Sequence, residues 1–208
     1  SYVITEGIPQ KYYETNGSLS YLMYNIMNVF PDINDEFYPN GASCIFRLSE
    51  TCIPFDPDYF FYGEDVYLGL KARFLGLKIK FVNDSVVHHI VEGSKSSNNF
   101  KTFCRERNRF LNLYLFFSPF FIFKMLPFIT FNHNLKVLLS LFSRKSSFTG
   151  TVKAYFWFYF NIPLILRKRK ELKEIKKVNE KEIIKYLSSR VFHGENFYER
   201  VLNKFSYT

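Results

Sequence analysis

The sequence contains few cysteines, and their placement excludes two common kinds of scaffold. Its 208 residues include three, Cys44, Cys52 and Cys104, which have neither the spacing of metal ligands nor an even number for disulfide pairing. We therefore expect a reduced, cytosolic chain. The sequence also lacks a recognisable signal peptide and any internal repeat. At this length a chain can bury a core, which predicts one domain with an appendage.

Long uncharged apolar runs are absent as well. A clean membrane span needs roughly 18–20 such residues, and the aromatic-rich runs 110–123 and 154–166 fall short of that length. The second run is followed by Arg167-Lys168-Arg169-Lys170. Basic flanks of this kind favour helices that lie in the headgroup region of a membrane, with the cations on anionic lipid. The alternative interpretation is an aromatic-rich helical hairpin buried in the core.

The net charge is +9, and aromatic residues make up 20% of the chain. A nucleic-acid-binding surface interleaves basic and aromatic side chains in one patch, whereas here the basic residues gather at the ends of apolar runs. We therefore expect a membrane surface, and no nucleic acid, among the partners. The predicted location is peripheral, at the cytoplasmic face of the cell membrane.

Residues 55–94 carry the clearest pattern of local structure. A helix is expected from Gly63-Glu64 to Gly76, because apolar residues from Leu68 to Leu75 recur on one face. Gly76 suits the helix end, because glycine adopts positive φ without strain. Segments 77–82 and 85–90 are short and β-branched, which predicts strands.

Glu64 and Asp65 fall in the first turn of this predicted helix. Free backbone N–H groups and the helix dipole there favour an ionised carboxylate. A general base must be ionised before it can accept a proton, so the position suits one. The alternative interpretation is that acidic residues are simply common in first helical turns.

Four short motifs occur in order along this part of the sequence. The run E-D-V-Y-L-G-L-K-A-R-F-L-G resembles the E-D-V-D-L-x-x-R-x-R-x-x-G motif of family 2 glycosyltransferases. Upstream, F-D-P-D-Y-F-F-Y resembles that family's F-D-E-x-F-F-x-Y, and Gly41-Ala42 with Arg47 resembles its G-A-x-x-x-x-R strand. Downstream, V-N-D-S-V-V-H-H is similar to the strand that ends in a functional histidine. The resemblance implies a glycosyltransferase-A fold of the rhamnosyltransferase-like kind, and inversion at the anomeric carbon of a nucleotide-linked sugar.

The resemblance also implies roles for individual residues. Asp65 would deprotonate the acceptor hydroxyl, and Glu64 would hold the acceptor. The acceptor and sugar site would further include Asn40, Gly41, Ala42 and Arg73. A plain turn at 39–41 is the alternative interpretation of the first three. Two departures from the family motif are Tyr67, where an acid is common, and Lys71, where an arginine is common.

Two adjacent histidines compete for the metal-ligand role that the resemblance implies. When residues 83–89 are aligned with the family pattern P-x-A-x-V-x-H, His89 takes the position of the functional histidine, and His88 is the alternative. On a strand the two side chains point to opposite faces. The metal would be Mg or Mn, with its other ligands supplied by the nucleotide-binding half. Arg107-Asn108 matches a family R-N pair, and either binding of the diphosphate or packing of the loop would explain it.

The same resemblance predicts that this sequence holds only the C-terminal part of such an enzyme. Family members open with a nucleotide-binding βαβ half of about a hundred residues, and residues 1–40 show no glycine-rich turn or series of leading strands. The expected fold class is α/β, with the C-terminal part of a glycosyltransferase-A type mixed sheet and flanking helices in residues 1–104. Residues 105–170 are predicted to form amphipathic or hydrophobic, membrane-associated helices, and 171–208 a charged helical tail.

Outside the motifs, the sequence predicts a short strand within 1–15, a helix over 18–30 and a strand over 42–48. Asn179 is expected to cap a helix in the tail. Together these inferences predict an inverting transferase that moves a sugar from a nucleotide-sugar donor to a glycan or lipid-linked acceptor, in cell-surface glycan biosynthesis. The alternative is a non-catalytic, membrane-docking fragment or subunit that needs a partner chain to supply the nucleotide-binding half.

Overall fold

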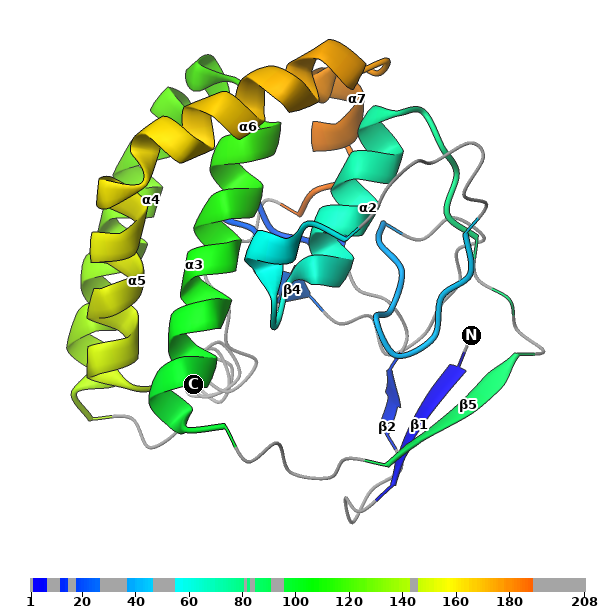
Figure 1. Ribbon diagram of the computed structural model, residues 1–208, viewed down its shortest axis with the longest axis horizontal. Coiled ribbons are helices and arrows are strands. Elements are labelled where there is room, and N and C mark those ends of the chain that lie inside the picture. The colour runs from blue at the N-terminus through cyan, green and yellow to red at the C-terminus, as the bar shows by residue number, and fades with distance from the viewer. Residues whose placement is uncertain are drawn as a thin grey trace, which may run out of the picture.

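The computed structural model is mostly helical, and its helices surround one central helix (Figure 1). It describes residues 2–6, 12–14, 18–26, 37–46, 55–80, 82, 85–90, 96–142 and 146–188. The helices are η1 (Pro57–Tyr59), α2 (Glu64–Phe74), α3 (Asn98–Phe116), α4 (Pro119–Ser140), α5 (Phe148–Phe160), α6 (Ile162–Ile175) and α7 (Glu180–Ile184). The strands are β1 (Tyr2–Glu6), β2 (Tyr12–Glu14), β3 (Ser18–Leu19), β4 (Asn25–Ile26) and β5 (Val86–Ile90).

The predicted α/β fold, with a glycosyltransferase-A type mixed sheet as its scaffold, is wrong. The described strands hold two to five residues each; β1 pairs with β2 and β5, and β3 pairs separately with β4. Helices α2 to α6 hold 11 to 22 residues and pack mainly on one another. Apolar residues in the second half of the chain recur with helical period, and a helix buries such a stripe most readily against another helix. Helix packing, not a sheet, therefore organises the fold.

Helix α3 lies between α2 on one side and α4 and α5 on the other (Figure 1). It begins at Ser97, whose hydroxyl accepts a hydrogen bond from the N–H of Phe100 at 3.3 Å. Ser118 and Ser147 cap α4 and α5 in the same way. The predicted boundaries at 104/105 and 170/171 both fall inside helices, α3 and α6. Continuous helices therefore connect the regions that the sequence suggested.

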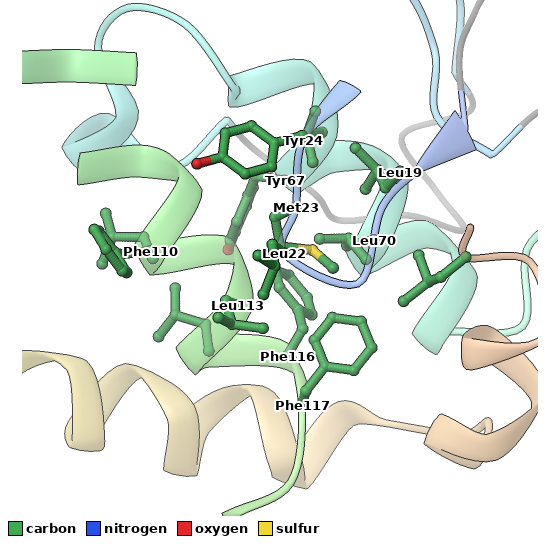
Figure 2. Packing of buried hydrophobic residues seen from close by; sticks show 14 of the residues in the cluster. Leu19, Leu22, Met23, Tyr24, Tyr67, Leu70, Phe110, Leu113, Phe116 and Phe117 are labelled. Atoms are coloured by element: carbon green, nitrogen blue, oxygen red, sulfur yellow. The ribbon is translucent and has the colours of Figure 1, made fainter. Parts of the chain in front are cut away.

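Apolar side chains from distant parts of the chain meet beside α3. Figure 2 shows Leu19 and Leu22 from the β3–β4 segment packed with Leu70 of α2 and with Leu113 and Phe116 of α3, and all five side chains are fully buried. Burying one such side chain stabilises a protein by about 1.5–3 kcal/mol. The core therefore fixes α2, and with it the candidate site, against the helical half.

A buried ionic cluster lies beside this core. Glu106 of α3 pairs with Arg109 at 3.0 Å and with Lys136 of α4. Arg109 also donates to the carbonyl of Leu22 at 3.1 Å, and its guanidinium lies 4.5 Å from the ring centroid of Tyr24. Burial alone would raise the pKa of Glu106, but Lys136 and Arg109 lower it to about 2. The cluster therefore joins α3, α4 and the β3–β4 segment through charge.

The helix predicted for residues 18–30 is wrong. Residues 18–26 form β3, a turn and β4, and residues 27–30 lie outside the described ranges. The Ser20 hydroxyl accepts from the N–H groups of Leu22 at 3.3 Å and Tyr24 at 3.0 Å, and Met23 adopts a φ of 60°. Such local side-chain hydrogen bonds offer the backbone an alternative to a helix.

Other local predictions are confirmed. They are the helix α2, the strand β5, a strand within 1–15 and the cap of α7, where Asn179 accepts from the N–H of Lys181 at 2.9 Å. The strands predicted for 77–82 and 42–48 do not form in the described parts of those segments, 77–80, 82 and 42–46. Within the ranges given above, no helix combines the length and apolar character that crossing a membrane requires.

Candidate active site

The start of α2 is built around Gly63. Gly63 is the N-cap of the helix and adopts a φ of +79°, which favours glycine. A Cβ at this position would lie 3.3 Å from the Cβ of Asn108, so the two backbones approach closely. This entry angle places Glu64 and Asp65 in the first helical turn, as the sequence predicts.

The Asp65 carboxylate lies against the turn that contains Gly41. A Cβ at Gly41 would be 3.6 Å from the Asp65 Cβ, 3.9 Å from Asp65 Oδ2 and 3.8 Å from Glu64 Oε1. Asp65 Oδ1 accepts from the N–H of Val66 at 2.7 Å, and the Gly41 backbone also donates to the carboxylate. The structure therefore brings together two predicted site segments that are separated by more than twenty residues in the sequence.

Burial and a like charge perturb the Asp65 carboxyl group. Removal from water is the larger cause and the neighbouring Glu64 the second, and together they raise the pKa of Asp65 to about 6, against the lowering effect of backbone N–H donors. The residue as a whole is partly exposed, so the carboxyl is enclosed while the site stays open. Glu64 Oε2 is buried and has no hydrogen-bond partner in the described part of the chain. Two acidic groups therefore share one confined site.

Asn40 shapes the turn that covers these carboxylates. Its side-chain Oδ1 accepts from the N–H of Ala42 at 2.8 Å, and its carbonyl accepts from the N–H of Ser43 at 3.1 Å. The predicted turn is confirmed. The contact of Asn40, Gly41 and Ala42 with an acceptor stays a prediction. Gly41 and Ala42 are exposed, so the turn presents its outer face to solvent.

Arg107 and Asn108 hold the loop that leads into α2. The Asn108 amide donates to the carbonyls of Tyr59 at 2.9 Å, Phe61 at 3.0 Å and Tyr62. Arg107 donates to the carbonyl of Asp58 at 2.6 Å and to Asn108 Oδ1 at 2.9 Å. Of the two roles that the sequence left open, the contacts support loop packing, while binding of a diphosphate stays a prediction.

Arg73 lies away from the carboxylates. It sits eight residues beyond Asp65, about 12 Å along the helix axis. The side chain is 6% exposed, donates to the carbonyl of Phe37 at 3.4 Å and lies over the ring of Tyr186 at 5.3 Å. The structure thus gives Arg73 a packing environment, and does not bring it together with Asp65.

The histidine pair lies on β5, which runs parallel to β1 with His88 opposite Ile4 and His89 opposite Thr5. The His88 side chain is exposed, and the side chain of His89 lies outside the described part of the structure. Among the described residues, no three His, Cys, Asp or Glu side chains gather as a metal site. The side chains that the structure describes therefore do not themselves provide a set of ligands for the predicted divalent metal.

Sequence reasoning missed the contact between Lys168 of α6 and the loop before α2. Lys168 Nζ lies 2.7 Å from both carboxylate oxygens of Asp56 and also pairs with Asp58. Asp56 in turn accepts from the N–H of Asp58 at 3.0 Å and caps η1. The helical period indicates only that Lys168 faces inward, because it lies on the same side of the helix as the buried Ile165 and Leu172; it does not indicate the partner.

Comparison with protein-family models, with curated proteins and with solved structures finds no match for this chain. The likeness to family 2 glycosyltransferases therefore rests on the motif residues quoted above. The geometry adds an enclosed carboxylate pair at a helix start, covered by an exposed turn.

Proposed function

We propose that this chain forms the acceptor side of a glycosyltransferase site, with Asp65 as the general base. The observation that carries the proposal is the seating of the Gly41 turn on Asp65 and Glu64, because it joins two motifs of the family pattern in one site. Because position 41 is glycine, the space next to the two carboxylates is free of a side chain, and any other residue there would narrow the path of an acceptor to them. An open approach of this kind suits an acceptor hydroxyl.

The chemistry of Asp65 suits proton removal near neutral pH. A pKa of about 6 leaves the group mostly ionised at pH 7 and yet more basic than an ordinary aspartate. In the proposed reaction the acceptor oxygen attacks the anomeric carbon, and its proton passes to Asp65. The bond from the anomeric carbon to the nucleotide diphosphate breaks with inversion. Glu64, beside Asp65, would accept a hydrogen bond from the acceptor through Oε1, the oxygen that lies next to the exposed Gly41 turn.

Binding of the nucleotide-sugar donor needs metal ligands and diphosphate-binding groups, and the described residues do not bring such a set together. The predicted metal and the nucleotide diphosphate would be held by other residues, in the same polypeptide or in a partner chain. No step of the proposal is therefore assigned to the metal, and His89 stays a predicted ligand.

The test is the Asp65→Asn variant in the complete enzyme. Membranes from the source cells supply the acceptor, and UDP-glucose, UDP-galactose and dTDP-rhamnose serve as donors, with release of nucleoside diphosphate as the measurement. We expect turnover to fall by about 10²–10⁴-fold, the usual contribution of a general base. In the unchanged enzyme, turnover should rise with pH through about 6, because only the ionised carboxylate can accept a proton.

Folding of the variant can be checked separately. The raised pKa of Asp65 adds stability that is complete below its ordinary value of 3.8 and is lost as the pH rises through about 6. Asparagine carries no charge, so Asp65→Asn should be at least as stable as the unchanged chain at pH 7. Glu182→Gln, in the first turn of α7, is the matched control and should retain full turnover.

Near-normal turnover of Asp65→Asn would contradict the proposal. If the unchanged protein releases no nucleoside diphosphate from any donor, and calorimetric titration with UDP and manganese shows no binding, the non-catalytic subunit becomes the better description.

A further inference from the structure

Helix α4 presents an apolar face to solvent on the side opposite its buried face. Phe121, Met125 and Ile129 point into the core. On the other side, Phe120 is 77% exposed, Phe123 is 73% exposed and Phe131 is 57% exposed. The exposed positions follow helical spacing, so α4 carries apolar side chains on its exposed side as well as on its buried side. Exposed apolar patches of this kind are typical of surfaces that bind another protein or a membrane.

Helix α5 repeats the arrangement next to α4. Phe156, Tyr159 and Phe160 are exposed, with Phe160 at 80%, while Ala154 and Phe158 are buried. Figure 1 shows α4 and α5 along the same side of α3, opposite α2, and the two helices contact each other. We call the six most exposed aromatic side chains of these two helices, namely Phe120, Phe123, Phe131, Phe156, Tyr159 and Phe160, the α4–α5 face.

The charge around this face has one sign. Residues 107–170 contain eleven lysines and arginines and no aspartate or glutamate. Some of the cations point inward: Arg109 and Lys136 to Glu106, and Lys168 to Asp56. Lys124 of α4 and Lys153 of α5 are exposed beside the aromatic side chains. The surroundings of the α4–α5 face therefore favour an anionic partner.

Exposed aromatic side chains together with positive charge favour one kind of binding partner for the α4–α5 face over another. A second copy of this chain would bring the same positive face against itself, and like charges disfavour that contact. A bilayer of anionic phospholipid offers phosphates for the lysines and an interface into which aromatic rings insert. Lysines near such a surface each contribute to the attraction, which salt weakens.

We propose that the α4–α5 face docks on the surface of anionic membranes, with its aromatic side chains in the headgroup region and Lys124 and Lys153 on lipid phosphates. The sequence-based expectation placed the basic residues that flank the apolar runs, Arg167 to Lys170 among them, on lipid. The inference differs for two of these, because Lys168 and Arg169 make contacts inside the protein. It does not rest on the proposed catalytic role of Asp65.

The experiment is co-sedimentation of the full chain with vesicles. One set contains phosphatidylcholine alone and the other includes about 30% phosphatidylglycerol, each at low and high salt. We expect binding to the anionic vesicles at least about tenfold stronger than to the neutral ones, and a marked loss at high salt. Equal binding to both sets would overturn the proposal.

Two pairs of variants locate the surface. Phe123→Ser with Phe131→Ser should reduce vesicle binding at least about tenfold, whereas Ile45→Ser with Val82→Ser, at exposed apolar positions elsewhere, should not. Lys124→Gln with Lys153→Gln should weaken binding to anionic vesicles only. The matched control is Lys78→Gln with Lys80→Gln, also exposed.

Circular dichroism checks that each variant folds. If the double variant does not fold, vesicle binding of the single variant Phe123→Ser tests the proposal. Equal losses in the test and control pairs would overturn the proposal. It would also be overturned by sedimentation equilibrium showing a dimer that Phe123→Ser dissociates, together with no binding to anionic vesicles. That result would assign the α4–α5 face to a second copy of the chain.

Discussion

Glu106 shows how a single buried charge is kept in an apolar environment. It is 3% exposed, yet the salt bridges to Arg109 and Lys136 keep it ionised. Removing one partner from a buried ion pair leaves the other charges without compensation, which costs more than losing the pair as a whole. Lys136 also lies over the ring of Tyr24, at 4.4 Å from its centroid. The Glu106 carboxylate is therefore the shared partner on which two cations depend.

We expect Glu106→Gln to lower the free energy of unfolding by about 3–5 kcal/mol at pH 7. Because the pKa of Glu106 is lowered from 4.5 to about 2, its contribution is complete above pH 4.5 and is lost as the pH falls through 2. The difference between the variant and the unchanged chain should therefore shrink across that range. Urea unfolding at a series of pH values measures it.

The control for Glu106 is Glu182→Gln, which removes an exposed partner of Lys185 three residues away. An exposed pair of this kind contributes less than about 1 kcal/mol. A loss of stability for Glu106→Gln that is as small as the control's, or that does not change between pH 4.5 and 2, would mean that the cluster does not hold its charges as described.

At the scale of elements, α6 and α3 fasten the loop that enters α2 from two sides. Asn108 of α3 binds the carbonyls of Tyr59, Phe61 and Tyr62, and Lys168 of α6 binds the carboxylates of Asp56 and Asp58. Phe60, between these contacts, has a φ of 33°, and Tyr62 has a φ of 63°. Backbone in these regions is strained for residues other than glycine, so it persists only where its surroundings hold it.

Lys168→Gln should release one side of this loop. We expect a loss of stability of about 1–3 kcal/mol, the usual effect of removing a charged hydrogen-bond donor, and faster amide hydrogen exchange at Tyr59 and Phe61. Lys170→Gln, on the exposed side of the same helix, is the control. Unchanged exchange in the loop after Lys168→Gln would show that Arg107 and Asn108 of α3 hold it without the contact from α6.

The elements that sequence reasoning predicted correctly are those that depend on neighbours within one or two turns. The limits of α2 follow from Gly63, from Gly76 with its φ of 80°, and from the apolar stripe between them. The cap of α7 by Asn179 is equally local. The helix predicted for 18–30 failed for a local reason as well. The apolar spacing of the segment favours a helix, but the side-chain hydrogen bonds of Ser20 compete with it, and this competing signal is weaker in the sequence.

The sheet prediction failed at longer range. It was carried over from a family fold to residues 1–104, and was not built from the pattern of those residues. For the candidate site, the pattern predicted the residues Asp65 and Gly41 but not the contact between them. The partners of Arg107 and Lys168 could not be predicted either, because these contacts join residues 49 and 112 positions apart and depend on packing, not on local spacing.

At the scale of the whole molecule, one hydrophobic core crosses all three regions that the sequence suggested. Its buried members extend from Leu19 of β3, through Leu70 and Leu113, to Leu172 of α6 and Leu187 after α7. The carbonyl of Leu19 also accepts from the N–H of Ser188 at 2.8 Å, which joins the β3–β4 segment to the last described residue. A core shared in this way should make the parts unfold together.

We therefore expect one cooperative thermal transition, with the same midpoint by far-ultraviolet circular dichroism, which reports all helices, and by fluorescence of Trp157, the single tryptophan, in α5. Leu113→Ala, at a side chain with 0% exposure, should lower the free energy of unfolding by about 2–5 kcal/mol and shift both midpoints equally. Leu138→Ala, on the exposed side of α4, should change it by less than about 0.5 kcal/mol. Two separate midpoints, or a Leu113→Ala shift in only one signal, would show that α5 and the candidate site belong to units that fold independently.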